Sequence, residues 1–253
     1  MNFSGKVALI TGAGSEKGIG RATAVKLSEG GATVIVADVN EAGVKQVAEG
    51  IRDEGGNAEG ITMDITDQSR VADAVNTLVE KYGKIDILVN NAGISRPTRV
   101  LDIPEDEWDL VFNINMKGLF FVTQSVLKSM KENEYGRVIN LSSVSGKRGG
   151  GIFGGSHYSA AKAGVTGFTK AIAREMAEFN ITCNTVAPGL VGGTNITGGL
   201  LTQEAEKQII EGIPLKRVGE VDDIAHSIAF LASEGAGYIT GEELDINGGS
   251  HID

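Results

Sequence analysis

VALITGAGSEKGIGRATAVKLSEGGATVIVAD, residues 7–38, is the stretch that decides the fold. An apolar run at 7–10 stops at a glycine-rich turn, helical spacing follows over 20–29, and a second apolar, β-branched run ends at Asp38. A strand, a helix and a strand in this order predict a βαβ unit, in which the two strands are parallel. Glycines let the backbone approach a ligand closely, and a helix N-terminus offers free N–H groups to a phosphate. We therefore expect a dinucleotide-binding turn at 11–20.

Strands and helices keep alternating along the rest of the sequence. Further strands are expected at 58–64, 85–93, 136–143, 181–189 and 242–248, and helices from Asn40 to about Asp53 and at 69–82, 105–130 (bent near Gly118), 158–178 and 221–232. Continuous apolar strands between helices indicate a parallel sheet that is covered on both faces. The expected fold is α/β: a single Rossmann domain over 1–253, with a doubly wound, seven-stranded parallel sheet that binds its ligand at the carboxyl ends of the strands.

The composition narrows the class of protein. A formal net charge of −10 lacks the basic field that nucleic-acid binders usually carry, so no nucleic-acid partner is expected. Cys183 is the only cysteine and lies in an apolar run, which indicates a buried structural thiol in a reducing compartment. The N-terminus lacks the features of a signal peptide, and no apolar run approaches membrane-spanning length. We expect a cytoplasmic protein with no membrane partner and no metal site.

Asp38 is the candidate that selects the cofactor. It ends the second strand, 18 residues after Gly20. A carboxylate at this place accepts hydrogen bonds from the adenosine ribose of NAD and repels the additional phosphate of NADP. The alternative is an ordinary strand-end or helix-capping carboxylate. Lys45 is also close in sequence, but it lies inside the following helix, so NAD is the predicted cofactor.

Tyr158 and Lys162, in YSAAK, are the candidates for proton transfer. Their spacing of four places both side chains on one face of a helix. A free tyrosine has a pKa of about 10, and we expect a neighbouring ammonium and a positively charged nicotinamide to lower that pKa. Ser143 ends the fifth strand, where its hydroxyl can hold the substrate oxygen. Asn115 lies among apolar residues, and a buried amide needs partners, such as a water chain from Lys162.

Six motifs follow one another along the chain: TGAGSEKGIG at 11–20, NNAG at 90–93, NLSS at 140–143, YSAAK at 158–162, APG at 187–189 and YITGEELDINGG at 238–249. In this set and order the sequence resembles the short-chain dehydrogenase/reductase family over essentially its whole length. The stretch at 213–241 is similar to the 3-oxoacyl-carrier-protein reductase branch of that family.

The resemblance implies a role for each matching residue. It implies that Tyr158 is the acid/base, that Lys162 lowers the pKa of Tyr158 and holds the nicotinamide ribose, that Ser143 binds the substrate oxygen, and that Asn115 anchors a relay water. A homotetramer is also implied, with a homodimer as the alternative. Besides Tyr158 and Lys162, the expected cofactor-binding residues are Gly12, Ser15, Lys17, Gly18, Ile19, Gly20, Asp38, Val39, Asp64, Ile65, Asn91, Ala92, Gly93, Pro188, Gly189, Val191 and Thr194.

The sequence departs from the family pattern at two places. The cofactor loop has two more residues before Gly18 than the usual pattern, so the contacts of Ser15, Glu16 and Lys17 stay open. Ser143 also stands two residues further from Tyr158 than usual, and a glycine-rich loop at 147–157 can absorb the difference. Enoyl reductases of the superfamily separate their Tyr and Lys by more residues than this chain does, which disfavours enoyl reduction.

The expected reaction is the NAD(H)-dependent interconversion of a secondary alcohol and a ketone or aldehyde. A small, polar substrate such as a sugar, polyol or hydroxy acid is favoured by the polar loops around the site, although a bulky apolar substrate such as a steroid is not excluded. The alternatives are 3-oxoacyl-carrier-protein reduction and, more remotely, a catalytically silent NAD-binding sensor or scaffold. The candidate substrate residues are Ser95, Arg96, Ser145, Phe153, His157 and Asn195. For the charges at Arg96, Arg99, Lys147 and Arg148, solvated surface groups are the favoured interpretation.

Overall fold

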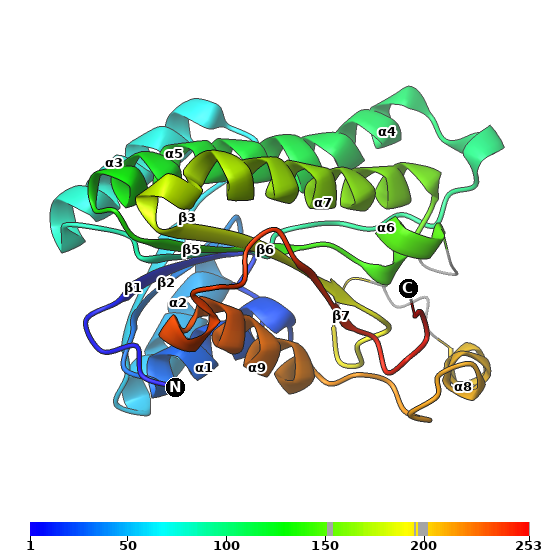
Figure 1. Cartoon of the computed structure of the whole chain (residues 1–253). Coiled ribbons are helices and arrows are strands. Elements are labelled where there is room, and N and C mark those ends of the chain that lie inside the picture. The colour runs from blue at the N-terminus through cyan, green and yellow to red at the C-terminus, as the bar shows by residue number, and fades with distance from the viewer. Residues whose placement is uncertain (151–153, 195, 197–201, 253) are drawn as a thin grey trace.

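A seven-stranded, all-parallel sheet in the order β3-β2-β1-β4-β5-β6-β7 organises the computed structural model (Figure 1). The structure describes residues 1–150, 154–194, 196 and 202–252, without the side chains of 203–205. The strands are β1 (Val7–Thr11), β2 (Thr33–Asp38), β3 (Asn57–Thr62), β4 (Ile87–Asn90), β5 (Gly136–Leu141), β6 (Ile181–Pro188) and β7 (Glu243–Ile246). The order changes direction between β1 and β4, where such sheets bind ligands. The predicted Rossmann fold is confirmed.

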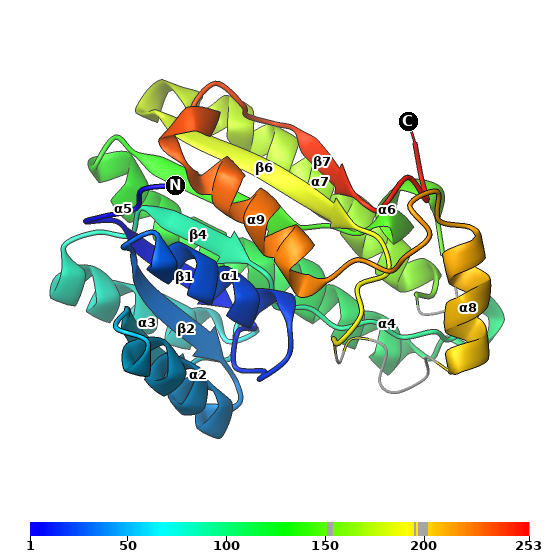
Figure 2. The same cartoon turned by 90° about the horizontal axis from the view of Figure 1, so that it is seen from below.

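Two helical layers cover the sheet. One face carries α1 (Ile19–Glu29), α2 (Glu41–Asp53) and α9 (Val221–Ala232), and the other carries α3 (Gln68–Tyr82), α5 (Leu119–Glu132) and α7 (Ser156–Met176) (Figures 1 and 2). Shorter elements are α4 (Glu105–Phe112), η2 (Asn113–Gly118), α6 (Val144–Arg148), α8 (Gln203–Glu211), and the 3₁₀ turns η1 (Val100–Asp102), η3 (Ala177–Phe179) and η4 (Glu234–Ala236).

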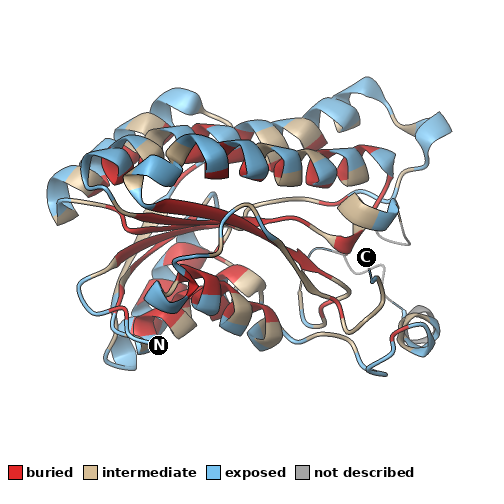
Figure 3. Ribbon diagram, viewed as in Figure 1, coloured by how far each residue is buried: buried red, intermediate tan, exposed pale blue. Residues whose placement is uncertain are grey.

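The core consists of two apolar layers, one on each face of the sheet. In β1, Ala8 and Ile10 pack into the α1/α2/α9 layer, whereas Val7 and Leu9 pack into the α3/α5/α7 layer. This alternation follows from the period of two along a strand. Figure 3 shows buried strands between helices whose outer faces are exposed. The carboxyl ends of the strands therefore form an edge of fixed geometry on which a site can be built.

The helix expected at 105–130 consists of three pieces. The middle piece, Asn113–Gly118, is π-helical. A Cβ atom on Gly118 would lie 2.7 Å from the Cδ1 atom of Ile65, so the chain needs a glycine at this contact. Short π segments inside helices are frequent at functional sites. The helices α6 and α8 were not expected from the sequence.

Among the described residues, one helical stretch, Glu105–Glu132, has the length and mean hydropathy, 1.2, of a membrane span. It is not an uninterrupted apolar run, because Asn113, Asn115 and Lys117 lie within it, and it meets the criteria of a span by length and composition only. Val111, Val122 and Val126 on this stretch are fully buried inside the protein. The stretch contacts α3 and α7, so the structure places it as a core helix.

Candidate active site

A cavity of about 1110 Å³ lies along the carboxyl ends of the strands. Its walls come from the loops that follow β1, β2, β3, β4, β5 and β6, together with α6, α7, α8 and the C-terminal tail. This is the place at which an open parallel sheet is expected to bind its ligand. It is large enough for a dinucleotide and a small substrate.

The turn after β1 is packed so tightly that only glycine fits at two positions. Gly12 has φ of +65°, and a Cβ atom on it would lie 2.6 Å from the Cα atom of Ala92. A Cβ atom on Gly20 would lie 2.6 Å from the Nδ2 atom of Asn91. Asn91 Nδ2 donates to the carbonyl oxygens of Thr11 (2.9 Å) and Gly12 (2.8 Å), which fixes the turn to β4. Gly18 gives α1 no side-chain cap, so the first N–H groups of α1 are free to receive an anion.

The lengthened part of this turn lies against α2. The Oγ atom of Ser15 donates to the carbonyl oxygen of Lys17 at 2.7 Å. Gln46 on α2 donates to Glu16, the residue between them, at 2.5 Å. A Cβ atom on Gly43 would lie 1.9 Å from the carbonyl oxygen of Gly14, so α2 can approach the turn only with a glycine there. The insertion is thus held on the surface of α2, while Ser15 and Lys17 still line the cavity.

Asp38 closes the far end of the dinucleotide half of the cavity. One carboxylate oxygen accepts from the Gly14 N–H group and the other from the Asn40 N–H group, each at 3.0 Å. Each oxygen keeps a second lone pair. Asp38 therefore fixes the turn after β1 and can still accept hydrogen bonds from a ligand. Both sequence interpretations of Asp38, the structural and the functional, are compatible with this geometry.

Ser143 and Tyr158 meet in the other half of the cavity. Ser143 is the N-cap of α6, and its Oγ atom accepts from the Ser145 N–H group at 3.1 Å. Tyr158 lies in the first turn of α7 and is buried. The Ser143 side chain lies close enough to Tyr158 to act in the direction that lowers the pKa of the phenol. Both residues line the cavity, and their joint role at the substrate oxygen stays a prediction.

Lys162 lies one helical turn after Tyr158, also buried. Its Nζ atom donates to the Leu141 carbonyl oxygen at 2.6 Å and lies 5.8 Å from the centre of the Tyr158 ring. Burial lowers the pKa of Lys162 to about 8. The expected lowering of the Tyr158 pKa by Lys162 is not found: burial raises the pKa of Tyr158, and the Ser143 contact only partly opposes this. The physical reason is that desolvation of the phenolate exceeds the hydrogen bond that stabilises it.

Asn115 is fully buried in the π-helical segment. Its Nδ2 group donates to the carbonyl oxygens of Ile94 (3.0 Å) and Val111 (2.9 Å). Its Oδ1 atom has no partner among the described residues. A Cβ atom on Gly93 would lie 2.7 Å from this Oδ1 atom and 3.4 Å from Lys162 Nζ, so both polar atoms face Gly93. This arrangement offers a water molecule an acceptor beside Lys162.

Comparisons with known proteins agree with this geometry. A family model described as enoyl-(acyl carrier protein) reductase matches residues 12–251. An uncharacterized short-chain type dehydrogenase/reductase of Sinorhizobium fredii is 43% identical over 100% of both chains. A 3-oxoacyl-[acyl-carrier-protein] reductase of Vibrio harveyi is 41% identical, again over 100% of both. The crystal structure of gox2181 has a TM-score of 0.94 and 33% identity, covering 98% of this chain and 96% of that one. The chain belongs to the short-chain dehydrogenase/reductase family.

Short-chain dehydrogenases/reductases are oxidoreductases that bind a nicotinamide dinucleotide. The cavity fits such a molecule because the packed glycine turn leaves free N–H groups for a pyrophosphate, and Asp38 lies where a ribose would follow. Of the expected cofactor-binding residues, only Gly20 does not line the cavity, because it packs behind the turn.

The expected substrate residues divide into three groups. Ser95, Arg96 and Ser145 line the cavity. His157 does not: its ring is fully buried, and its Nε2 atom lies 3.1 Å from the Glu107 carboxylate on α4. Phe153 and Asn195 lie outside the described residues. His157 is thus placed as a contact between α4 and α7 rather than as a wall of the cavity.

Several features of this family member were missed by sequence reasoning. Glu107, Val111 and Asn115 are spaced by four, and they meet α7 in order: Glu107 contacts His157, Val111 packs with Tyr158, and Asn115 approaches Lys162. The regular spacing was the available signal for this register. The missed cavity-lining residues include Thr66, Leu110, Ile114, Arg148, Gln208, Ile209 and Ser250.

Proposed function

We propose that this short-chain dehydrogenase/reductase interconverts a secondary alcohol and a ketone or aldehyde with NAD(H), and that Tyr158 is its acid/base. The observation that carries the proposal is the convergence of Ser143, Tyr158 and Lys162 in one cavity with the glycine turn and Asp38. Such a convergence is what a reaction needs when a proton must reach the substrate oxygen as its carbon is oxidised or reduced.

The roles follow from the contacts. Bound nicotinamide supplies hydride transfer to or from the substrate carbon. The Tyr158 hydroxyl donates a proton to the substrate oxygen in reduction and accepts it in oxidation, while Ser143 holds that oxygen in place. Because burial favours protonated Tyr158, the resting site is set up as a proton donor. Lys162 and Asn115 are placed to pass the proton on through water.

Replacement of Tyr158 by phenylalanine tests this assignment. Tyr158→Phe removes only the hydroxyl group, and turnover is expected to fall roughly 10²–10⁴-fold because general acid/base help is lost. Reduction of NAD by an alcohol panel and oxidation of NADH by a ketone panel are followed by absorbance, with dinucleotide binding measured by calorimetry as the control. Unchanged turnover with retained binding contradicts the proposal. Binding without turnover by the wild-type protein across both panels supports the sensor alternative instead.

NAD rather than NADP is proposed because Asp38 presents a carboxylate at the ribose end of the cavity. Asp38→Asn keeps an oxygen acceptor for the Gly14 N–H group but removes the charge. The ratio of kcat/KM with NADP to that with NAD is expected to rise at least about tenfold, which corresponds to about 1.4 kcal/mol. Asp53→Asn, at the exposed end of α2, is the matched control and should leave the ratio unchanged. An equal ratio in all three proteins places the discriminating group elsewhere.

A second candidate function is 3-oxoacyl-carrier-protein reduction, which the 41% identity to the Vibrio harveyi reductase favours. Asp38 speaks for NAD, and comparison of NADH with NADPH on an acetoacetyl thioester separates the two candidates. Enoyl reduction, the description of the matching family model, is disfavoured by the short Tyr158–Lys162 spacing. We further propose a cytoplasmic homotetramer, with a homodimer as the alternative, which size-exclusion chromatography with light scattering distinguishes.

A further inference from the structure

The charged side chains that line the cavity are segregated by sign. The two carboxylates, Asp38 and Asp64, follow β2 and β3 at the adenosine end. Around Ser143 and Tyr158 the described lining contains arginines and no carboxylate. The charged lining residues are Lys17, Asp38, Asp64, Arg96, Arg148 and Lys162. In a chain of net charge −10, a substrate half without any described carboxylate is unexpected.

Arg96 is held beside the start of α7. Its carbonyl oxygen accepts from the Gly155 N–H group at 2.7 Å, and Gly155 is the N-cap of the helix that carries Tyr158. Among the described residues, its guanidinium makes one hydrogen bond, to the neighbouring Ser95 carbonyl oxygen at 3.0 Å. No described carboxylate forms an ion pair with it. Its remaining N–H groups are therefore available to a ligand.

Arg148 lines the same cavity. It ends α6, the short helix that Ser143 caps. Its guanidinium donates to the Ser250 carbonyl oxygen at 3.3 Å, which leaves most of its donors unused. The neighbouring Lys147 forms an ion pair with Asp245 at 2.7 Å, whereas no described carboxylate pairs with Arg148. The nearby acidic residue thus neutralises Lys147 and leaves Arg148 positive.

We propose that Arg96 and Arg148 bind the carboxylate of the substrate, and that the substrates are small 2- or 3-hydroxy acids and the corresponding oxo acids. This inference rests on the proposed function. A planar guanidinium matches a carboxylate with two parallel hydrogen bonds, and a cavity lined by two guanidinium groups without a described carboxylate partner favours an anionic ligand. In the oxidation, the hydroxy acid would give a hydride from its C–H bond to bound NAD⁺ and its hydroxyl proton to the deprotonated form of Tyr158. The proton that Tyr158 carries at rest would first leave through Lys162 and water, so the products are the oxo acid, NADH and one proton released to solvent.

The proposal separates three kinds of substrate. A neutral sugar, polyol or steroid gains nothing from the two positive charges. A carrier-bound thioester is neutral at the reacting end but carries a phosphate on its pantetheine arm. A hydroxy acid places its anion one or two carbons from the reacting carbon, which matches arginines that lie in the same cavity half as Ser143 and Tyr158.

The test uses pairs of substrates in which a methyl ester replaces the charged carboxylate. Pyruvate and acetoacetate, each beside its methyl ester, are reduced with NADH by the wild-type protein and by Arg96→Gln, Arg148→Gln and Arg99→Gln. Arg99 is the control because it is exposed and outside the cavity lining. Each of the first two changes should lower kcat/KM for the better acid by roughly 10- to 100-fold, mainly through KM, because a hydrogen bond to a charged group is lost. The ester rates and the Arg99→Gln protein should stay within about twofold of the wild type.

Calorimetry covers the case in which none of these compounds turns over. Binding of 3-hydroxybutyrate and of its neutral amide to the NAD-loaded protein is compared, and the acid is expected to bind tighter and to weaken with salt. Equal binding of acid and amide, or equal kcat/KM for acid and ester in all variants, overturns the inference. An arginine effect on acetoacetyl-phosphopantetheine but not on the free acids or on the N-acetylcysteamine thioester also overturns it, because the anion is then the phosphate. If Tyr158→Phe still abolishes turnover of neutral alcohols, the proposed function survives that failure.

Discussion

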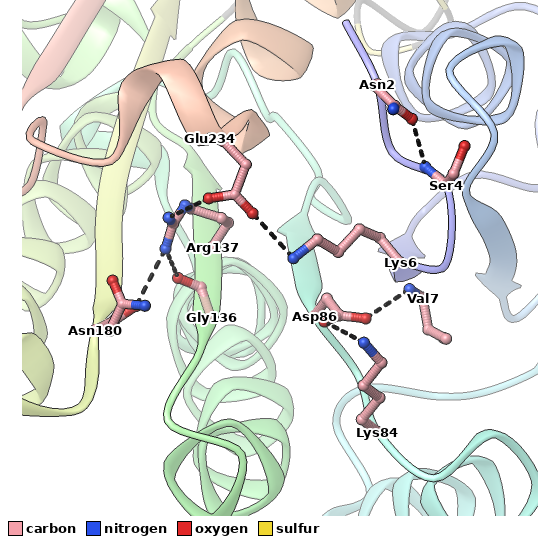
Figure 4. Close-up of polar contacts among 10 residues, drawn as sticks. All are labelled: Asn2, Ser4, Lys6, Val7, Lys84, Asp86, Gly136, Arg137, Asn180 and Glu234. Carbon is pink, nitrogen blue, oxygen red and sulfur yellow. Dashed lines mark hydrogen bonds and ion pairs between the residues drawn. The ribbon is translucent and has the colours of Figure 1, made fainter.

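The charged side chains at the two ends of the strands differ in how completely other groups of the protein pair with them. The amino edge is the side of the sheet at which the strands begin, and the carboxyl edge is the side at which they end. At the amino edge, Arg137 is buried at the start of β5, and its guanidinium donates to the carbonyl oxygens of Gly136 (2.8 Å) and Asn180 (3.1 Å) (Figure 4). Glu234 lies 3.6 Å from Arg137 and 3.0 Å from Lys6. The charged side chains at this edge are paired with other groups of the protein, although Arg137 Nε has no partner among the described residues.

At the carboxyl edge, some buried polar groups lack hydrogen-bond or ion-pair partners among the described residues. Among the described residues, Asn115 Oδ1 has no partner, and no carboxylate forms an ion pair with the buried Lys162. We infer that buried polar groups without partners lower the free energy of unfolding at the edge where the site lies. Paired groups at the amino edge contribute to stability. Unpaired groups at the carboxyl edge lower stability in the absence of a ligand, and a ligand can pair with them.

Lys162→Met should produce the largest change, with opposite signs for activity and stability. Loss of the ammonium is expected to lower kcat at least about 100-fold. The same change should raise the free energy of unfolding at pH 7 by up to about 3 kcal/mol, because the pKa falls from 10.5 to about 8 on burial and each unit corresponds to about 1.4 kcal/mol. Urea unfolding measures the second effect. Lys170→Met, at an exposed position of the same helix, is the control.

The pH dependence of the free energy of unfolding of the wild type measures the same destabilisation by the buried Lys162 charge. The folded pKa of Lys162 lies below its unfolded value, so between about pH 8 and 10.5 the unfolded chain binds more protons than the folded one. The cost of the buried charge is fully present below pH 8, and this residue's contribution to stability rises with pH across that window. Lys162→Met should lack the rise. A destabilised Lys162→Met protein at pH 7 would contradict the view that the carboxyl edge stores this cost.

Arg137→Met makes the reciprocal change at the amino edge. The Gly136 and Asn180 carbonyl oxygens lose a donor, and Glu234 loses one of its two cationic partners. The free energy of unfolding is expected to fall by about 1–3 kcal/mol, because buried acceptors are left unsatisfied. Because Glu234 is exposed to water, the larger cost of a stranded buried charge is not expected. The activity of the folded enzyme should not change.

The measurement for Arg137→Met combines urea unfolding with kcat determined on the folded fraction. Arg174→Met, which removes an exposed arginine of α7, is the matched control and should alter the unfolding free energy by less than about 0.5 kcal/mol. A stable Arg137→Met protein with impaired turnover would reverse the comparison, because it would place a functional group at the amino edge.

The parts of the molecule that depend on local pattern were predictable from the sequence. Apolar strands that alternate with helices determine the parallel sheet, and the ends of β2 and β5 place Asp38 and Ser143 at one edge. The spacing of Tyr158 and Lys162 puts both on one helical face. These inferences need only the periods of helix and strand and the polarity of a parallel sheet.

The parts that depend on tertiary packing were not predictable. The π-helical segment around Asn115 arises where α4 and α5 must meet both Ile65 and α7, and no single stretch of sequence encodes that. The direction of the Tyr158 pKa is set by burial, which is a property of the assembled cavity. Arg148 and Ser250, which are far apart in the sequence, both line the cavity and are hydrogen-bonded to each other.

Asp223→Asn should give the smallest change in the free energy of unfolding. It is a useful comparison because the carboxylate of Asp223, on α9, is paired with other groups of the protein. Its carboxylate accepts two hydrogen bonds from Arg217 (2.6 and 3.0 Å) and one from the Glu220 N–H group (2.8 Å). These contacts, the Arg217 pair first, lower the pKa of Asp223 to about 2. The side chain of Arg217 is 51% exposed and that of Asp223 is 34% exposed, so solvent screening limits the contribution of the pair to below about 1 kcal/mol.

The sign of its pH dependence is opposite to that of Lys162. The folded pKa of Asp223 lies below its ordinary value of 3.8, so its contribution is fully present above that value and is lost as the pH falls towards 2. The wild type should therefore exceed Asp223→Asn in unfolding free energy at pH 7, and the gap should narrow at pH 3. Asp222→Asn, in the same first turn of α9, is the control because no hydrogen bond or ion pair of its carboxylate is found among the described residues. If the difference in free energy of unfolding between the wild type and Asp223→Asn stays constant from pH 7 to pH 3, Asp223 acts through its hydrogen-bond geometry alone. The paired charge would then add no electrostatic stability.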